Sequence, residues 1–159
     1  MEPDSLPKVR PAEAGDSVAL SELFGELGFP CSPHEVLDRF GAAEETALVA
    51  TLEGRIVGVI TTNVMPVLHR PMPVGRISAL VVAQDNRGLG IGRVLVTAAE
   101  ALLASRGCGL VEVTSNFRLE RAHGFYESVG YEATSYRFKK DLGAGPNNSF
   151  KPKPLRGSA

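Results

Sequence analysis

The sequence predicts a mixed α/β domain, in which helices cover both faces of a central sheet. Two observations support this fold class. Short β-rich segments alternate along the chain with segments whose apolar residues recur at i, i+3, i+4 and i+7, the spacing of one helix face. In the second half, these segments follow one another as strand, helix, strand, helix, strand. The length of 159 residues suits a single domain.

Before residue 45 the chain predicts one strand and two helices. Residues 8–12 form a weakly signalled strand, and Pro11 suits the edge of a sheet better than its centre. A helix is expected over residues 16–27, where leucine and phenylalanine recur at helical spacing. A second helix should begin at Ser32 and run to about residue 40, because serine followed by proline and then by glutamate is a capping signal.

The rest of the chain predicts five further strands and two helices. The dipeptide Glu53-Gly54 predicts a hairpin, and prolines mark residues 66–75 as a loop. Residues 1–142 are expected to form one domain, and residues 143–159, which are poor in apolar side chains, a disordered tail. Strands are expected over residues 47–52, 55–64, 76–83, 110–115 and 131–142, and helices over residues 91–106 and 119–129.

Composition argues against several classes of protein. A net charge of −1 disfavours a nucleic-acid binder that works by neutralising phosphates. No apolar stretch is long enough for a membrane helix or a signal peptide, so we expect a cytoplasmic protein with no membrane partner. Cys31 and Cys108 make no disulfide framework and are expected to be reduced. The three histidines lie far apart, so no metal site is predicted.

Residues 87–92, Arg-Gly-Leu-Gly-Ile-Gly, lie between a predicted strand and a predicted helix. Such a turn exposes backbone N–H groups at the start of a helix, where the helix dipole also favours an anion. Glycines let the backbone approach a phosphate closely, and Arg87 adds a positive charge. The turn is therefore predicted to bind a phosphate or pyrophosphate.

Three other interpretations of this turn compete. A Walker A loop requires Gly-Lys-Ser/Thr, but Gly92 is followed by Arg93. A dinucleotide-binding fingerprint requires a glycine where Arg93 stands; Glu112 has the spacing of the ribose-binding acid but lies within a predicted strand. The third interpretation is a tight turn that binds nothing, which three alternating glycines after an arginine disfavour.

Two motifs occur in order in the second half of the chain. The first, Arg/Gln-x-x-Gly-x-Gly/Ala after an apolar strand, is matched by Arg87, Gly90 and Gly92. The second, Ala-x-x-Phe/Leu-Tyr-x-x-x-Gly-Phe/Tyr, is matched by residues 122–131, Ala-His-Gly-Phe-Tyr-Glu-Ser-Val-Gly-Tyr. With their flanking strands these blocks cover about residues 76–140. They resemble the GNAT superfamily of acetyl-CoA-dependent N-acetyltransferases.

The resemblance implies a sheet splayed open between its fourth and fifth strands, residues 76–83 and 110–115, with acetyl-CoA in the cleft. Backbone N–H groups of the turn would hold the pyrophosphate, and the pantetheine arm would pair with the fourth strand. Asn116, after the fifth strand, is a further candidate contact. The cofactor-binding residues implied are Leu80, Val81, Val82, Arg87, Gly88, Leu89, Gly90, Ile91, Gly92 and Arg93.

The resemblance also implies that acetyl passes by direct attack to a primary amine of a small molecule or a protein. Tyr126 would be the general acid that protonates the CoA thiolate; the alternative is a half-buried aromatic that only packs. Many members carry a basic glutamate before the glycine turn, whereas residues 77–79 are Ile-Ser-Ala. His123 and His69 are candidates near the chemistry, although packing or surface positions suit each histidine better.

A second class of function stays open at this point. Without the strand glutamate, the chain could be a non-catalytic domain that binds or senses CoA. Members of the superfamily are often dimers, so a homodimer is a candidate assembly.

Overall fold

A computed structural model describes residues 6–143 of the chain. The expected disordered tail, except Gly143, lies outside the described residues. Short 3-10 turns at Ala14–Asp16 and Gln84–Asn86 complement the longer elements. In chain order these elements are β1 (Lys8–Pro11), α1 (Ser17–Leu27), α2 (Pro33–Phe40), β2 (Thr46–Leu52), β3 (Arg55–Met65), β4 (Val74–Val82), α3 (Ile91–Ser105), β5 (Leu110–Val113) and α4 (Glu120–Ser128).

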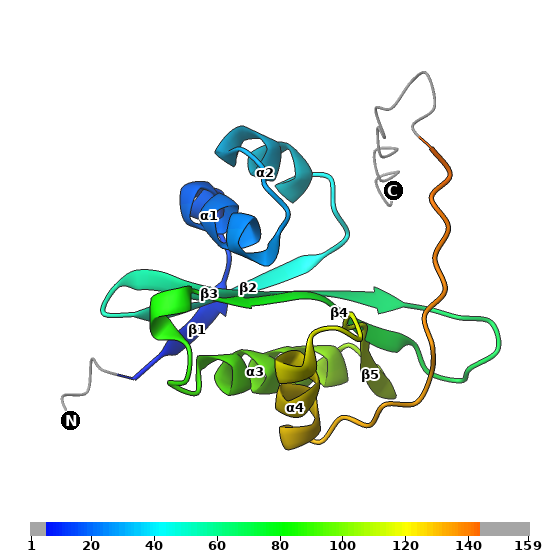
Figure 1. Cartoon of the computed structure of the whole chain (residues 1–159). Coiled ribbons are helices and arrows are strands. Elements are labelled where there is room, and N and C mark those ends of the chain that lie inside the picture. Colours follow the sequence, from blue (N-terminus) through cyan, green and yellow to red (C-terminus); the bar gives the residue numbers. More distant parts are fainter. Residues whose placement is uncertain (1–5, 144–159) are drawn as a thin grey trace.

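The strands form one sheet in the order β1-β2-β3-β4-β5. The first three pairs are antiparallel and the pair β4–β5 is parallel. Helices α1 and α2 lie over one face of this sheet, whereas α3 and α4 lie on the other (Figure 1). The predicted fold class, a mixed sheet between helices, is confirmed.

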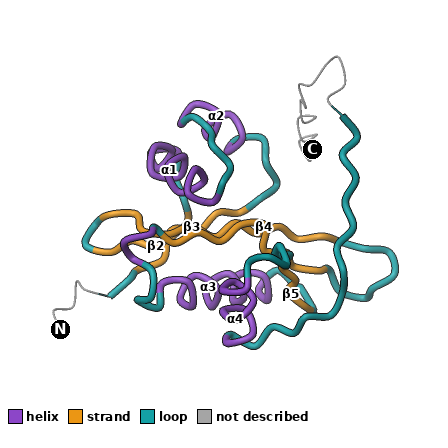
Figure 2. Tube along the Cα trace, viewed as in Figure 1, coloured by secondary structure: helices purple, strands orange, loops and turns teal. Residues whose placement is uncertain are grey.

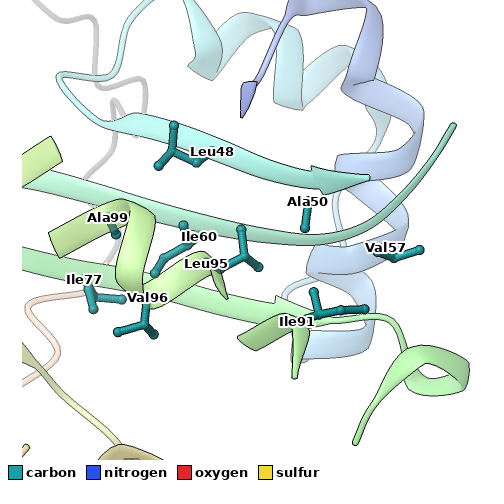
Figure 3. Packing of buried hydrophobic residues seen from close by; sticks show 9 residues of the cluster. All are labelled: Leu48, Ala50, Val57, Ile60, Ile77, Ile91, Leu95, Val96 and Ala99. Carbon is teal, nitrogen blue, oxygen red and sulfur yellow. The ribbon is translucent and has the colours of Figure 1, made fainter. Parts of the chain in front are cut away.

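Each face of the sheet has its own apolar core. On the α3 side, Ile91, Leu95 and Ala99 come from one face of the helix and pack against strand residues (Figure 3). The strand side of this cluster includes Leu48, Ile60 and Ile77, each less than one-tenth exposed. The second core lies under α1 and α2 and contains Leu20, Leu23, Val36, Val49, Val59 and Val81. The apolar residues that recur at helical spacing in the helices and at alternate positions in the strands thus fill both cores.

Two local signals formed as the sequence predicts. The Ser32 side chain accepts a hydrogen bond from the backbone N–H of Glu35 at 3.2 Å, and the Glu35 carboxylate accepts one from Ser32 N–H at 2.7 Å, which completes the capping box of α2. Between β2 and β3, Glu53 and Gly54 both have positive φ, 50° and 76°. Two positive φ values are typical of the type I′ hairpin turn, whose twist matches that of the strands.

The sheet is splayed between β4 and β5. The parallel ladder ends at the pair Ile77–Val113, whereas β4 continues to Val82 without a strand on that side. The divergence coincides with a β-bulge, because Ile77 pairs with Thr62 and Ala79 with Thr61, which leaves Ser78 unpaired. Bulges bend and twist the strand that carries them. The cleft between β4 and β5 therefore begins at Ser78.

The strand expected over residues 131–142 is wrong. The described residues after α4 form no strand, and Figure 2 shows this segment as loop. Its alternating pattern is that of a strand, but residues 132–143 form no backbone hydrogen bond to another described residue. A strand requires a partner, and the described part of the chain supplies none. Elsewhere the boundaries differ by a few residues, β4 for example beginning at Val74 instead of residue 76.

Candidate functional site

The glycine turn presents a run of unused backbone donors. Gly90 is the N-cap of α3, and its carbonyl accepts the first helical hydrogen bond from Val94 at 3.2 Å. The N–H groups of residues 88–93 donate to no described residue. A helix leaves its first N–H groups without intrahelical partners, and the helix dipole adds positive potential there. The turn has the donors and the potential to bind an anion.

Two glycines make room above these donors. Gly88 and Gly90 both have φ of 79°, a conformation that residues with a Cβ rarely adopt. A Cβ built on either one would have no atom within 4 Å, so the space over the turn is open. At Gly92, in contrast, a Cβ would lie 3.2 Å from the Phe125 ring, which is how α4 packs beside the start of α3. Leu89 is exposed and Ile91 is buried in the core.

The two arginines of the turn are engaged within the chain. The Nε of Arg87 donates to the carbonyl of Val82 at 3.1 Å, and its Nη2 lies 4.0 Å from the carboxylate of Glu26. Arg93 is exposed, and its Nη2 lies 3.5 Å from the carbonyl of Ser128. In this arrangement the guanidinium groups flank the turn, and the donors that point into it are those of the backbone.

The open edge of β4 turns backbone groups towards the cleft beside this turn, and of these the Val82 carbonyl accepts the hydrogen bond of Arg87. Ala83 N–H donates to Val57 at 2.8 Å, which fixes the alternation of bonds along the antiparallel pair with β3. The N–H and C=O groups of Val81 therefore point towards β3, whereas those of Leu80 and Val82 point towards the cleft. Side chains alternate as well: Val81 packs under α1, whereas Leu80 and Val82 pack on the α3 side.

Tyr126 lies on α4, half-buried among aromatic neighbours. Its ring centroid is 5.3 Å from that of Phe125 and 5.9 Å from that of Tyr131, both with edge-to-face geometry. Burial raises the pKa of Tyr126 above its ordinary value, so the hydroxyl keeps its proton at neutral pH. No described side chain or backbone group forms a hydrogen bond with this hydroxyl. The Tyr126 hydroxyl is thus protonated and donates to no described residue.

Asn116 and His123 are tied to one another. The Asn116 side-chain Oδ1 accepts a hydrogen bond from Arg118 N–H at 3.0 Å. The backbone carbonyl of Asn116 accepts one from Leu119 N–H at 2.9 Å. The Nε2 of His123 lies 2.9 Å from the same carbonyl, so it carries the proton of that contact. His123 therefore fastens the start of α4. His69 lies exposed in the loop before β4.

Sequence reasoning missed a carboxylate beside the bulge. The Ser78 hydroxyl donates to the carboxylate of Glu45, which precedes β2, and lies 2.8 Å from the hydroxyl of Thr61. Residues 77–79 carry no acid of their own, but the fold brings Glu45 to that place across 33 positions of sequence. A run of two glutamates at a strand entrance was the only signal, and it resembles an ordinary solvated loop.

A cavity of about 340 Å³ opens on the α1–α2 side at this same point. Its floor contains Thr61, Ser78 and Ala79, and Glu45 lies on its wall. The remaining wall comes largely from α1, α2 and the loop between them. Ser78 therefore lies both on the floor of the cavity and at the point where the edge of β4 becomes open.

Three further types of site can be checked among the described residues: metal clusters, disulfides and membrane helices. Within residues 6–143, no three His, Cys, Asp or Glu side chains are placed to share a metal ion. Both cysteines, Cys31 and Cys108, are free thiols. None of the described helices has the length and the apolar character needed to cross a membrane.

Comparisons with known proteins agree with this geometry. An aminoalkylphosphonate N-acetyltransferase from Salmonella typhimurium is 35% identical over 94 residues, which are 59% of this chain and 61% of that relative. A glucosamine 6-phosphate N-acetyltransferase from Trypanosoma brucei brucei is 33% identical over 143 residues, 85% of this chain and 95% of that relative. The chain thus spans about three fifths of the first relative and nearly all of the second.

A solved structure and a family model both match the chain to acetyltransferases. The crystal structure of an acetyltransferase from Trypanosoma brucei superposes with a TM-score of 0.74 at 29% identity, over 86% of this chain and 100% of that one. The model of the acetyltransferase (GNAT) family matches residues 18–131, from the start of α1 to the end of the second motif. The chain therefore belongs to the GNAT acetyltransferase family.

Proposed function

We propose that the chain transfers the acetyl group of acetyl-CoA to a primary amine. One observation carries the proposal: the unused N–H groups of residues 88–93 adjoin the open edge of β4. A pyrophosphate matches the first feature, because it is anionic and accepts several hydrogen bonds. An amide-containing arm such as pantetheine matches the second, because Leu80 and Val82 offer strand-like backbone groups.

Each residue then has a defined task. The backbone of Gly88 to Arg93 binds the pyrophosphate, and open space over Gly88 and Gly90 admits it. Since Arg87 now donates to the Val82 carbonyl, its guanidinium is expected to turn towards the phosphates when the donor binds. The N–H of Leu80 points into the cleft and can polarise the thioester carbonyl. Asn116, with its amide nitrogen unpaired among the described residues, is a further contact.

The chemistry is a direct attack. The neutral amine nitrogen forms a bond to the acetyl carbon, and the carbon–sulfur bond breaks. The nitrogen loses a proton to solvent water, and the departing thiolate gains one. Tyr126 supplies the proton to the sulfur, because its raised pKa keeps the hydroxyl protonated. Holding both substrates in one cleft supplies much of the rate.

The relatives support an amine as the acceptor. Their names specify N-acetylation of an aminoalkylphosphonate and of glucosamine 6-phosphate, which are both small amines. A third relative, from Escherichia coli, is named a peptidyl-lysine N-acetyltransferase, so a protein amine is a second candidate acceptor. The cavity beside Glu45 offers an open-mouthed site for a small acceptor.

The test is release of free CoA thiol from acetyl-CoA in the presence of a mixed panel of primary amines, with the acetylated product identified by mass. We expect thiol release that depends on an amine. Tight binding of acetyl-CoA with no turnover of any amine or lysine peptide would instead identify a CoA-binding or sensing domain. Failure to bind acetyl-CoA would contradict both functions.

The proposal includes a homodimer. Residues 132–143 leave their backbone groups unpaired among the described residues and expose Tyr136 at 90% and Phe138 at 91%. Among the described strands, β5 has a partner on one side only. A second copy can cover both features by strand pairing. Light scattering should give twice the mass of the chain, and replacing Tyr136 and Phe138 by serine should shift it to the single mass; a monomeric wild type would contradict the dimer.

A further inference from the structure

We propose that the cavity between α1, α2 and the sheet selects a primary monoamine that carries an apolar, aromatic-sized body, and that Glu45 binds its amino group. This inference rests on the proposed function and names its acceptor class.

The lining is dominated by large apolar side chains. Three of the chain's seven phenylalanines, Phe24, Phe29 and Phe40, line this one cavity. Phe29 is 68% exposed and Phe40 is 38% exposed, so both rings face solvent at its rim. Large apolar side chains gathered in the open around a hollow are typical of a ligand site. A hydrophobic substituent would remove these rings from water.

The charges of the lining are one carboxylate and one guanidinium. Among residues 6–143, Glu45 is the only acid that lines the cavity, and Arg39 is its only cation. The Arg39 guanidinium forms no hydrogen bond or close ion pair with a described residue, and its charge helps to lower the pKa of Glu35 on the same helix. A monoamine finds one partner in Glu45. A polyamine would bring a second cation against Arg39 and find no second carboxylate, which disfavours polycations.

The position of Glu45 relates this lining to the transfer step. Its carboxylate accepts the hydrogen bond of Ser78, the bulge residue at which β4 leaves β5. Two positions further along β4, Leu80 turns its backbone towards the cleft where the thioester is proposed to lie. An amino group held at Glu45 therefore lies at the junction of cavity and cleft, while its apolar body extends under the phenylalanines.

The cavity volume favours a compact acceptor. At about 340 Å³ it is near the lower end of the 300–1,000 Å³ range of small-molecule sites. A single ring with a short aminoalkyl chain suits this space, whereas an oligosaccharide does not. The chemical class is therefore an arylalkyl or branched alkyl monoamine.

The experiment compares four probes by calorimetry in the presence of CoA and by release of CoA thiol from acetyl-CoA. They are 2-phenylethylamine, ethanolamine, spermidine and 2-aminoethylphosphonate. We expect 2-phenylethylamine to bind and to have a kcat/KM at least about tenfold above each of the others, because burial of its ring supplies that difference. A higher kcat/KM for ethanolamine, spermidine or the phosphonate would overturn the acceptor class while leaving the proposed function intact.

Matched variants test the two contacts. Glu45→Gln should weaken 2-phenylethylamine binding about tenfold or more, because it removes a charge-assisted contact, whereas Glu44→Gln should not. Phe40→Ala should weaken the same binding about tenfold, whereas Leu37→Ala, also exposed on α2 but outside the cavity, should not. Equal effects within either pair would overturn the assignment.

The remaining outcomes separate this inference from the proposed function. Binding of 2-phenylethylamine that depends on Glu45, without acetylation of any probe, would leave the amine site standing and contradict the transferase. Acetylation of other amines, with 2-phenylethylamine neither bound nor acetylated, would support the transferase and contradict the proposed acceptor class. Circular dichroism of each variant ensures that a lost contact, and not a lost fold, is measured.

Discussion

The guanidinium of Arg10 in β1 clamps the carboxylate of Asp16 through two hydrogen bonds, Nη1 to Oδ2 at 2.8 Å and Nη2 to Oδ1 at 2.9 Å. The carboxylate also accepts the backbone N–H of Glu13 at 2.8 Å, and the Asp16 side chain is only 10% exposed. This clamp fixes the first strand to the start of α1, the helix that covers the cavity.

The clamp predicts a pH dependence of stability. The hydrogen bonds from Arg10 lower the pKa of Asp16 below its ordinary value, against an opposing effect of burial. A lowered folded-state pKa contributes stability that is present above the unfolded pKa of about 3.9 and is lost as the pH falls through the folded pKa. Asp16→Asn should therefore lower the free energy of unfolding by about 1–3 kcal/mol at pH 7 and by less near pH 3.

Urea denaturation at the two pH values measures this difference. Asp85→Asn is the matched control, because Asp85 is exposed and forms no ion pair with a described residue. An Asp16→Asn effect that stayed the same at both pH values would show that the clamp does not titrate with the fold.

Gly90→Glu should abolish acetyl-CoA binding in a folded protein. The new side chain would stand in the open space over the turn and bring a negative charge to the proposed pyrophosphate site. Gly107→Glu is the control, because Gly107 has a similar φ of 83°, also has open space, and lies past the other end of α3. Both variants pay a similar cost for a left-handed residue, about 1–2 kcal/mol. Calorimetry that finds equal acetyl-CoA affinities for the two would contradict the site.

Tyr126→Phe should lower kcat by about 10²–10⁴-fold with little change in acetyl-CoA affinity, because it removes only the proposed proton donor. Tyr136→Phe removes an exposed hydroxyl from the same kind of ring and should leave kcat unchanged. Steady-state kinetics of both variants measure the difference. A Tyr126→Phe rate within about threefold of wild type would mean that solvent protonates the thiolate, and a loss confined to KM would make Tyr126 a binding residue.

Gly75→Ala should destabilise the fold by about 1–2 kcal/mol, whereas Gly109→Ala should be nearly neutral. A Cβ at Gly75 would lie 2.8 Å from a methyl of Leu103, which is fully buried, so the neighbour cannot give way. A Cβ at Gly109 would lie 2.7 Å from the terminal methyl of Met72, which is 53% exposed and can move, and 3.1 Å from the Met72 Cβ, which needs a shift of only a few tenths of an ångström. Thermal or urea unfolding should rank the two; the reverse order would contradict this account.

Contacts close in sequence made much of this fold predictable. The capping box at Ser32 and Glu35 and the turn at Glu53-Gly54 depend on residues within three positions of each other, and both formed. The glycine turn was identified by the same logic, since its donors and its glycines lie within six consecutive residues. Periodicity then placed the helix faces, because each face repeats within one element.

What the sequence left hidden depends on pairing between distant segments. Glu45 meets Ser78 only because β2, β3 and β4 align, and nothing near either residue indicates that contact. The strand predicted over residues 131–142 was wrong for a related reason. Their alternation is that of a strand, but alternation states only that a partner would suit them and not where that partner lies.

Ser78 is an extra residue in the ladder between β3 and β4, because it has no partner there. Its neighbours Ile77 and Ala79 pair with Thr62 and Thr61, which are themselves consecutive, so every partnered residue of β3 and β4 would keep its partner if Ser78 were deleted. In evolutionary terms the gain or loss of a single codon separates a regular β3–β4 ladder from one that bulges. The chain without Ser78 should keep both cores and have a free energy of unfolding at least as large. It would lose the point where an amine and a thioester could meet.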